Sequence, residues 1–254
     1  VAVPPAKLAE VVADALATYG KATVTDVGSV KGTVLADLRA RGVNLARYVG
    51  SHPMAGSQRV GPLTARADLF ADRTWVITPH DTSRAKAVLT LHALARACGA
   101  RIVSMGATHH DEAVAQVSHL PQLMSSLTAA RLNDVPDEHL NLAGQGLRDV
   151  TRIAHSDSSL WATIVAGNAE SVANVLRPVR DELSRLIDAL EPGADDPFAP
   201  GVLAGISHVI SRVNEGVERI PGKHGGAPRR YAEVIAARST DWGRMLSANS
   251  RKHW

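Results

Sequence analysis

Residues 22–51 read ATVTDVGSVKGTVLADLRARGVNLARYVGS, and two β-branched runs in this stretch flank a segment with apolar residues at helical spacing. The runs at 22–26 and 48–51 are typical of buried strands, whereas residues 30–41 between them are typical of an amphipathic helix. Gly42 follows the helical segment, and glycine readily adopts the left-handed conformation that ends a helix. A succession of strand, helix and strand predicts a parallel strand pair in an α/β domain.

The same alternation extends over residues 1–108. Further strands are predicted at residues 1–3, 74–78 and 101–104, and further helices at residues 6–19 and 83–98. Residues 56–72 lack a clear periodicity and are predicted to form a long loop, a kind of segment that often carries functional residues. These elements together predict a Rossmann-type, mostly parallel sheet covered by helices.

Helical periodicity dominates from residue 109 onward, so residues 109–221 are predicted to form an all-α domain. Helices are predicted at residues 110–132, 151–167, 172–190 and 201–219. Pro121 interrupts the first of them and is expected to kink it or to mark a junction. Apolar helices commonly bury their faces against a second copy, so we expect a homodimer through this domain. Residues 222–254 are predicted to be a flexible tail that begins with Gly222-Lys223-His224-Gly225-Gly226.

The composition limits the classes of partner. A net charge of +3, spread over mixed acidic and basic residues, provides no extended positive patch and argues against nucleic-acid binding. No segment is long and apolar enough to cross a bilayer, and the N-terminus lacks the pattern of a signal peptide. Cys98 is the only cysteine, so no disulfide can form within the chain. We therefore expect a cytoplasmic protein.

Distinctive residues follow three of the predicted strands. The strands end in Val3-Pro4-Pro5, in Asp26-Val27-Gly28-Ser29 and in Ser51-His52-Pro53. Because ligands of parallel α/β sheets bind beyond the carboxyl ends of the strands, Ser29 and His52 are expected to converge at one edge. A histidine can accept a proton near neutral pH, since its ordinary pKa is about 6.5. From position alone, Ser29 is as readily the cap of a helix, whose free backbone N–H groups favour anionic ligands. His52 is as readily a hydrogen-bonded histidine at the rim of the sheet.

Four motifs occur in order along the chain. They are Thr25-Asp26-Val27-Gly28-Ser29-Val30-Lys31-Gly32, Gly50-Ser51-His52-Pro53-Met54-Ala55-Gly56-Ser57, Val117-Ser118-His119-Leu120-Pro121 and Asp149-Val150-Thr151-Arg152-Ile153-Ala154, with Trp161 and Asn168 behind them. In residues and in order, this set resembles the prephenate/arogenate dehydrogenase family over about residues 1–220. The resemblance implies an enzyme of tyrosine biosynthesis that uses NAD, with NADP as the alternative cofactor.

The resemblance implies the oxidative decarboxylation of prephenate to 4-hydroxyphenylpyruvate. Hydride leaves C4 for the nicotinamide, the C4 hydroxyl loses its proton, and the ring loses carbon dioxide as it becomes aromatic. By resemblance, His52 is the catalytic histidine that hydrogen-bonds the C4 hydroxyl, and Ser29 is the serine that bridges this histidine and the nicotinamide. Arg152 matches the arginine that binds a carboxylate of the substrate, a task that suits a guanidinium fork.

Further residues are expected to line the site. The cofactor is expected to contact the ends of the strands, at Val3, Pro4, Asp26 and Ser29. His119 is expected to pack between helices or to support the substrate pocket from behind. A metal site that combines His109-His110-Asp111 with His119 is disfavoured, because no ligand motif of matching spacing is present.

Two positions depart from the family pattern. Gln122 stands where relatives often have a histidine that faces the side chain of the substrate, and Gln58 stands where they often have glutamate. A glutamine can donate and accept hydrogen bonds but cannot become a cation. These changes leave prephenate and arogenate as alternative substrates, because the two differ by a keto or an amino group on the side chain.

The opening of the family pattern is also missing. The turn Gly-x-Gly-x-x-Gly does not occur in the sequence, and neither do the elements that flank it. At about 30 residues per βαβ unit, about 60 or more residues are expected to be absent, so the Rossmann-type sheet is expected to be incomplete. The alternatives are therefore a prephenate dehydrogenase, an arogenate dehydrogenase, or a catalytically silent dimeric fragment with an incomplete cofactor site.

Overall fold

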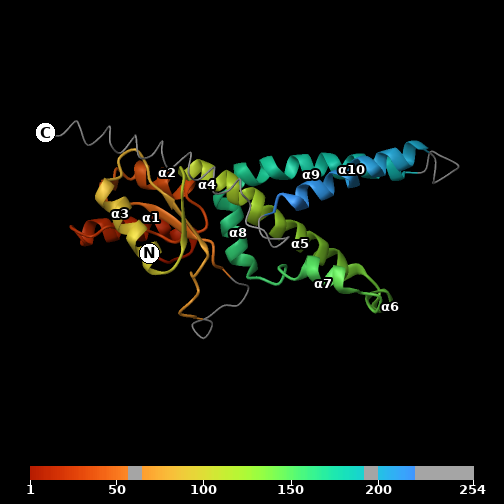
Figure 1. Cartoon of the computed structure of the whole chain (residues 1–254), viewed down its shortest axis with the longest axis horizontal. Coiled ribbons are helices and arrows are strands. Elements are labelled where there is room, and N and C mark those ends of the chain that lie inside the picture. The colour runs from red at the N-terminus through yellow and green to blue at the C-terminus, as the bar shows by residue number, and fades with distance from the viewer. Residues whose placement is uncertain (57–64, 192–199, 221–254) are drawn as a thin grey trace. The chain divides into compact units, whose positions relative to one another are not determined.

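The computed structural model describes residues 1–56, 65–191 and 200–220, which carry the elements labelled in Figure 1. Residues 1–175 form one compact unit, and residues from 176 onward belong to a second. The predicted domain boundary at residue 108 falls inside the first unit and stays a prediction. Gln58 and the predicted tail at 222–254 lie outside the described residues.

The described strands form a small mixed sheet in the order β1 (Gly50–Pro53), β2 (Thr74–Thr78) and β3 (Arg101–Ser104). β1 runs antiparallel to β2, and β2 runs parallel to β3. The antiparallel pair is the exception in the mostly parallel sheet that the sequence predicted. Parallel neighbours need a crossover, usually a helix, whereas antiparallel neighbours can be joined by a loop alone. The described residues between β1 and β2 contain no helix.

The predicted strands at residues 1–3 and 22–26 continue the sheet beyond β1 as hydrogen-bonded segments. The N–H of Val24 donates to the carbonyl of Arg47 at 2.9 Å, and the carbonyl of Val24 accepts from Val49 at 3.0 Å, which is the pattern of a parallel pair. Val1 bonds in the same way to the second segment. The carboxyl ends of both segments and of β1 therefore lie at one edge of the sheet.

Helices pack against two separate clusters of apolar side chains. One cluster lies under α1 (Pro5–Thr18) and α2 (Gly32–Ala40), and the other lies under α3 (Ala85–Ala97). Tyr48 belongs to the first cluster and its neighbour Val49 to the second, because successive side chains of an extended strand point to opposite faces. A short 3-10 helix, Leu45–Arg47, precedes them. The three predicted helices of this part are confirmed, with small differences at their ends.

The predicted helix at 110–132 is a continuous succession of three helical segments. α4 (Ala107–Val114) leads into a π-helical turn (Ala115–His119), which leads into α5 (Leu120–Arg131). Pro121 stands in the first turn of α5, where its missing N–H removes little from the helix. The proline therefore marks a junction, which was one of the two expectations for it.

The chain then forms short helices before the long ones. They are a 3-10 helix (Leu132–Asp134), α6 (Asp137–Leu140), α7 (Gln145–Thr151) and α8 (Ser158–Gly167). The predicted helix at 151–167 is wrong in its first half. Asp157 accepts a hydrogen bond from the N–H of Leu160 at 2.9 Å and starts α8 there, so residues between α7 and α8 form a turn.

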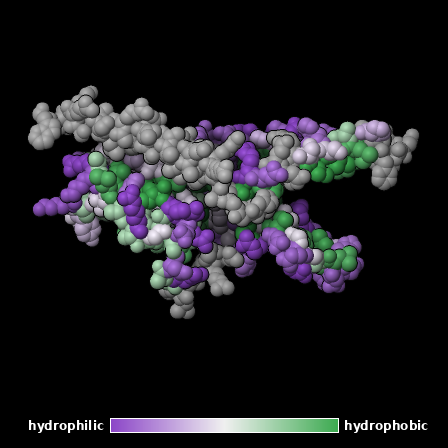
Figure 2. All heavy atoms as spheres, viewed as in Figure 1, coloured by the Kyte–Doolittle hydropathy of each residue, from purple (hydrophilic) through white to green (hydrophobic). Residues whose placement is uncertain are grey.

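Two long helices, α9 (Ala169–Leu190) and α10 (Pro200–Glu218), confirm the last two helical predictions. Leu183, Ile187 and Leu190 follow one another at helical spacing on α9 and are all exposed, as is Ile210 on α10. Figure 2 shows hydrophobic residues on this part of the molecule. None of the described helices combines the length and the apolar character that a bilayer crossing requires.

Candidate functional site

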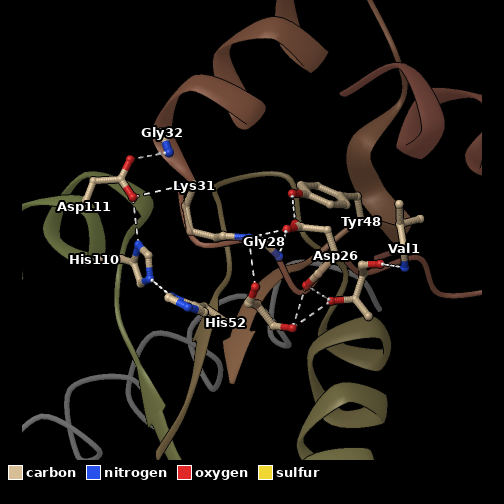
Figure 3. A network of polar contacts seen from close by, with 11 residues as sticks. Val1, Asp26, Gly28, Lys31, Gly32, Tyr48, His52, His110 and Asp111 are labelled. Carbon is tan, nitrogen blue, oxygen red and sulfur yellow. Dashed lines mark hydrogen bonds and ion pairs between the residues drawn. The ribbon is translucent and has the colours of Figure 1, made fainter. Parts of the chain in front are cut away.

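His52 lies in β1, at the edge where the two parallel segments also end. Its side chain is half-buried, and Pro53 after it favours an extended backbone. Its Nδ1 lies 2.9 Å from Nε2 of His110, a fully buried residue of α4, and the two ring centroids are 5.2 Å apart (Figure 3). The sheet and the helical part thus meet at a pair of histidines.

Asp111 connects His110 to the start of α2. Its Oδ1 lies 2.7 Å from Nδ1 of His110 and accepts a hydrogen bond from the N–H of Lys31 at 2.9 Å. Its Oδ2 accepts from the N–H of Gly32 at 2.7 Å, and a Cβ added at Gly32 would lie 2.8 Å from this oxygen. A carboxylate in this place satisfies N–H groups that have no partner inside the helix, and the helix dipole stabilises it.

This carboxylate corrects one expectation for Ser29. The start of α2 does not offer these N–H groups to a ligand, because the side chain of Asp111 accepts from them. The N-cap residue of α2 is Lys31, so Ser29 is not the cap. Ser29 is half-buried in the segment before α2, and no hydrogen bond joins it to His52 in the described chain. Its contacts with His52 and with the cofactor stay predictions.

A buried ionic network lies beneath the strand that carries His52. Lys31 forms an ion pair with Asp26, and its Nζ also donates to the carbonyl of Ser51 at 2.8 Å. The carboxylate of Asp26 further accepts from the hydroxyl of Tyr48 at 2.7 Å and from the N–H of Gly28 at 2.8 Å. Asp26 is fully buried, so its carboxylate holds the strand ends together from inside. Its predicted contact with the cofactor stays a prediction.

The surroundings of His52 favour its neutral form. Burial lowers the pKa of His52 well below its ordinary value, and the positive charge of Lys31 and the rings of His110 and His119 lower it further. Burial likewise lowers the pKa of Lys31, although Asp26 opposes this effect. Near neutral pH, His52 is therefore a base with a free electron pair on its ring.

The residues at the first strand end are less enclosed. Val3 is half-buried beside the first apolar cluster, and Pro4 is exposed at the position that precedes α1. Both lie at the same edge as His52, because the segment at 1–3 runs parallel to its neighbours. Their contacts with the cofactor are not tested by this geometry.

Arg152 and Gln122 lie together in the helical part. Arg152 is exposed at the C-terminal end of α7, and no hydrogen bond or ion pair joins it to His52 in the described chain. The side-chain amide of Gln122, from α5, is buried and donates to the carbonyl of Ile153 and to the hydroxyl of Ser156, both at 2.9 Å. Gln122 therefore holds the turn that carries Arg152, and a direct contact of Gln122 with the substrate stays a prediction.

His119 lies inside the helical part. It is buried, its Nδ1 lies 3.3 Å from Nδ2 of Asn168, and its ring meets that of Trp161 edge to face. Asn168 also donates to the carbonyl of Asp111 at 2.7 Å, which ties α8 to α4 directly behind His110. The part of His119 in substrate binding stays a prediction. Among the described residues, no group of three or more histidine, cysteine or acidic side chains is arranged to hold a metal ion.

Sequence reasoning missed the connection between His52, His110 and Asp111. The sequence presented His110 and Asp111 only as disfavoured metal ligands, because their partner lies 58 residues away on a different element. The signal that the sequence offered is a histidine next to an aspartate near the start of a predicted helix, just after a predicted strand.

Two family models match the chain in succession. Residues 1–104 match the model described as "Prephenate dehydrogenase, nucleotide-binding domain". Residues 106–202 match the model described as "Prephenate dehydrogenase, dimerization domain".

Individual proteins agree with these models. NovF of Streptomyces niveus, described as a probable prephenate dehydrogenase, is 34% identical over 227 residues, which are 89% of this chain and 63% of that protein. A cyclohexadienyl dehydrogenase of Zymomonas mobilis is 31% identical over 194 residues, which are 73% of this chain and 65% of that protein. This chain thus spans less than two thirds of either relative. The solved structure of prephenate dehydrogenase from Aquifex aeolicus, in complex with hydroxyphenyl propionate and NAD+, is similar with a TM-score of 0.71 at 26% identity, over 86% of this chain and 73% of that one.

Proposed function

This chain belongs to the prephenate dehydrogenase family, and from that premise we propose that it catalyses the oxidative decarboxylation of prephenate to 4-hydroxyphenylpyruvate with NAD+ as hydride acceptor. One observation carries the proposal. A neutral histidine stands at the carboxyl edge of the sheet, where α/β proteins bind ligands, and a buried histidine and aspartate hold it in place.

The residues at this edge suit the nicotinamide end of the cofactor. Val3 and Pro4 are apolar, Ser29 supplies a hydroxyl, and the carboxylate of Asp111 occupies the N–H groups at the start of α2. Such a lining fits the flat nicotinamide ring, which is a pyridinium cation in NAD+, better than an anionic phosphate. The turn Gly-x-Gly-x-x-Gly does not occur in these 254 residues, so we assign the pyrophosphate to none of them. When bound, NAD+ accepts the hydride from C4 of the substrate.

His52 is proposed as the group that takes the proton of the C4 hydroxyl. As that proton moves to His52, the C4 oxygen becomes the phenolic oxygen of the product, and the bond from the ring to its carboxylate breaks to release carbon dioxide. A general base must be largely unprotonated at the working pH, and the lowered pKa of His52 meets this need.

Arg152 is proposed to bind a carboxylate of the substrate. It is exposed and therefore accessible, and Gln122 fixes the turn that follows it. A guanidinium group can donate two parallel hydrogen bonds to a carboxylate, which orients the substrate as well as binding it.

The direct test mixes the chain with prephenate and NAD+ near neutral pH and follows the absorbance of the reduced nicotinamide. We expect turnover, and we expect His52→Asn to lower kcat by about 10²–10⁴-fold, the usual contribution of a general base. The matched control is His109→Gln, because His109 is an exposed histidine of α4. Full turnover by the His52 variant would refute the assignment of this residue.

Arogenate is the alternative substrate, because one relative is named a cyclohexadienyl dehydrogenase and because Gln122 replaces a histidine of the family pattern. Comparing kcat/KM for prephenate and arogenate in the wild type separates the two. We expect prephenate to be preferred and Gln122→His to change the ratio. A tenfold preference for arogenate in the wild type would replace the first proposal.

A catalytically silent dimeric fragment is the remaining alternative, because the sequence contains no glycine-rich turn for the cofactor. Calorimetric titration of the 254-residue chain with NAD+ and with NADP+ tests it. Binding of NAD+ would contradict the alternative of a silent fragment, and tighter binding of NADP+ would correct the choice of cofactor. Absence of any binding together with absence of turnover would favour the silent fragment.

We also propose that the helical part forms a homodimer and that the protein is cytoplasmic. The dimerization model covers residues 106–202, and exposed apolar residues follow one face of α9. Light scattering of the purified chain tests the dimer, and a monomer at micromolar concentration would contradict it.

A further inference from the structure

We infer, on the premise of the proposed function, that His110 and Asp111 form a relay that places a hydrogen on Nδ1 of His52 and leaves Nε2 as the atom that takes the substrate's proton. In this relay, His110 and Asp111 are positioning residues that act through His52. The inference rests on the chain of contacts from His52 through His110 to Asp111 and on the burial of its inner members (Figure 3).

The relay begins at the carboxylate of Asp111. Three donors point at its two oxygens, namely the backbone N–H groups of Lys31 and Gly32 and the Nδ1 of His110. Hydrogen bonds donated to a carboxylate favour its ionised form, which can only accept. The hydrogen between Asp111 and His110 therefore resides on Nδ1 of His110.

The second step follows from the hydrogen count of an imidazole. A neutral imidazole carries one N–H, so a neutral His110 that donates from Nδ1 has a bare Nε2. That Nε2 lies 2.9 Å from Nδ1 of His52, a distance at which one of the two nitrogens must carry a hydrogen. His52 is therefore the donor, and its remaining nitrogen, Nε2, holds the free electron pair.

The competing arrangement is a doubly protonated His110. Its Nε2–H would then donate to Nδ1 of His52, and Nε2 of His52 would carry the hydrogen and could not act as a base. The charged and titratable groups that face the pair are Lys31 beneath the strand, His119 behind α4 and Asp111 itself. Lys31, which forms an ion pair with Asp26, repels a further cation, whereas the carboxylate of Asp111 attracts one. The relay takes the neutral His110, and the hydrogen positions on the ring nitrogens distinguish the two arrangements.

The relay has a consequence for the reaction. When Nε2 of His52 takes the proton of the C4 hydroxyl, the ring becomes positive and its Nδ1–H still donates to His110, so no hydrogen moves inside the relay. The carboxylate of Asp111 then faces the new positive charge through one imidazole. The arrangement follows the logic by which a buried aspartate orients a catalytic histidine directly, with one ring inserted between them.

The experiment reads the hydrogen positions directly by NMR of the ring nitrogens in the 254-residue chain labelled with ¹⁵N-histidine. His52→Gln assigns the signals by their disappearance. We expect Nδ1 of His52 to be protonated and Nε2 to be bare at neutral pH. In His110→Phe, which keeps a ring but has no acceptor, we expect His52 to shift toward the Nε2–H form that histidine favours in water. Protonated Nε2 in the wild type, or an unchanged signal in His110→Phe, would overturn the relay.

Two further variants keep the result interpretable. His110→Gln can present an amide oxygen to His52 and an amide N–H to Asp111, so we expect it to retain the wild-type tautomer even if the phenylalanine variant folds poorly. His109→Gln, on the exposed face of the same helix, is expected to leave the His52 signals unchanged.

The NMR result does not require turnover, so it separates this inference from the proposed function. With prephenate and NAD+, we expect His110→Phe to lower kcat by about 10²-fold or more while KM changes little, and His110→Gln to restore part of the loss. A tautomer shift without any wild-type turnover would leave the relay standing and count against the proposed reaction. Wild-type turnover with no tautomer shift in His110→Phe would count against the relay and leave the proposed reaction standing.

Discussion

Replacing Lys31 with methionine is expected to destabilise the first unit by several kcal/mol. Methionine has a similar length but no charge and no donor, so Asp26 keeps only the hydroxyl of Tyr48 and the N–H of Gly28, and the carbonyl of Ser51 loses the donor that Lys31 supplied. Removing one partner of a buried ion pair costs about 3–5 kcal/mol, whereas exposed pairs contribute about 0–1 kcal/mol. Because the side chains of Lys31 and Asp26 are 1% and 0% exposed, the larger range applies.

Urea unfolding followed by circular dichroism measures this change, and a double variant isolates its cause. Asp26→Asn combined with Lys31→Met removes both charges, so we expect it to recover much of the stability that Lys31→Met alone loses. The matched control is Lys7→Met on α1, where the ion pair with Glu10 is exposed and little change is expected.

Two outcomes would refute this reasoning. A loss below about 1 kcal/mol in Lys31→Met would place the pair in the range of exposed ion pairs. A double variant as unstable as the sum of the two single variants would show that the charges of Lys31 and Asp26 do not depend on each other.

Three further predictions concern the pH dependence of stability, substrate binding and the close contact between Gly32 and Asp111. Burial lowers the pKa of His52 and of His119, so the unfolded chain takes up protons below pH about 6.5 that the folded chain refuses. The free energy of unfolding is therefore expected to keep its full value above that pH and to decrease as the pH falls below it. Urea unfolding at a series of pH values from about 8 to about 5 measures this, and a free energy that does not change with pH would contradict it. Arg152→Gln is expected to raise KM for prephenate about 10–100-fold, as expected for a lost hydrogen bond between charged groups. Its stability is expected to be unchanged, because Arg152 is exposed. An unchanged KM would exclude the proposed binding of the substrate carboxylate by Arg152. Gly32→Ala places a Cβ 2.8 Å from the carboxylate of Asp111 and is expected to lower the free energy of unfolding in urea by about 1–3 kcal/mol. Gly106→Ala, with nothing within 4 Å of its added Cβ, is the control and is expected to cost little. Equal stability of the two variants would show that the carboxylate of Asp111 moves away freely.

Much of the fold could be predicted because its helices carry strong periodicity. The helices α1, α3 and α9 begin and end near the predicted residues, since their apolar faces recur at helical spacing. The antiparallel pairing of β1 with β2 could not be predicted in the same way. A short apolar run has no direction of its own, and its pairing depends on how the connecting segment returns the chain.

The candidate site could likewise be predicted only in part. His52 could be singled out because a strand end followed by proline is a local pattern. The roles of His110 and Asp111 could not, because they depend on contacts with Lys31 and His52, which come from other elements far along the chain. For Gln122, sequence reasoning pointed toward the substrate, whereas its amide bonds the turn behind Arg152.

The π-helical turn at Ala115–His119 sets the angular phase between the two ends of one long helix. A π turn holds about one residue more than an α turn, and each α-helical residue advances the face by about 100°. The π turn accommodates its extra residue within one full turn, so removing that residue would leave the faces of α4 and α5 nearly in phase. One residue inserted into the regular turns on either side, between His110 and Gln122, would instead rotate α5 by about that angle against α4. His110 would keep its place beside the sheet, while Gln122 would leave the Ile153 turn. Insertions beside the π turn would thus uncouple the proposed proton-accepting end of the site from the end that carries Arg152 without altering a residue of either.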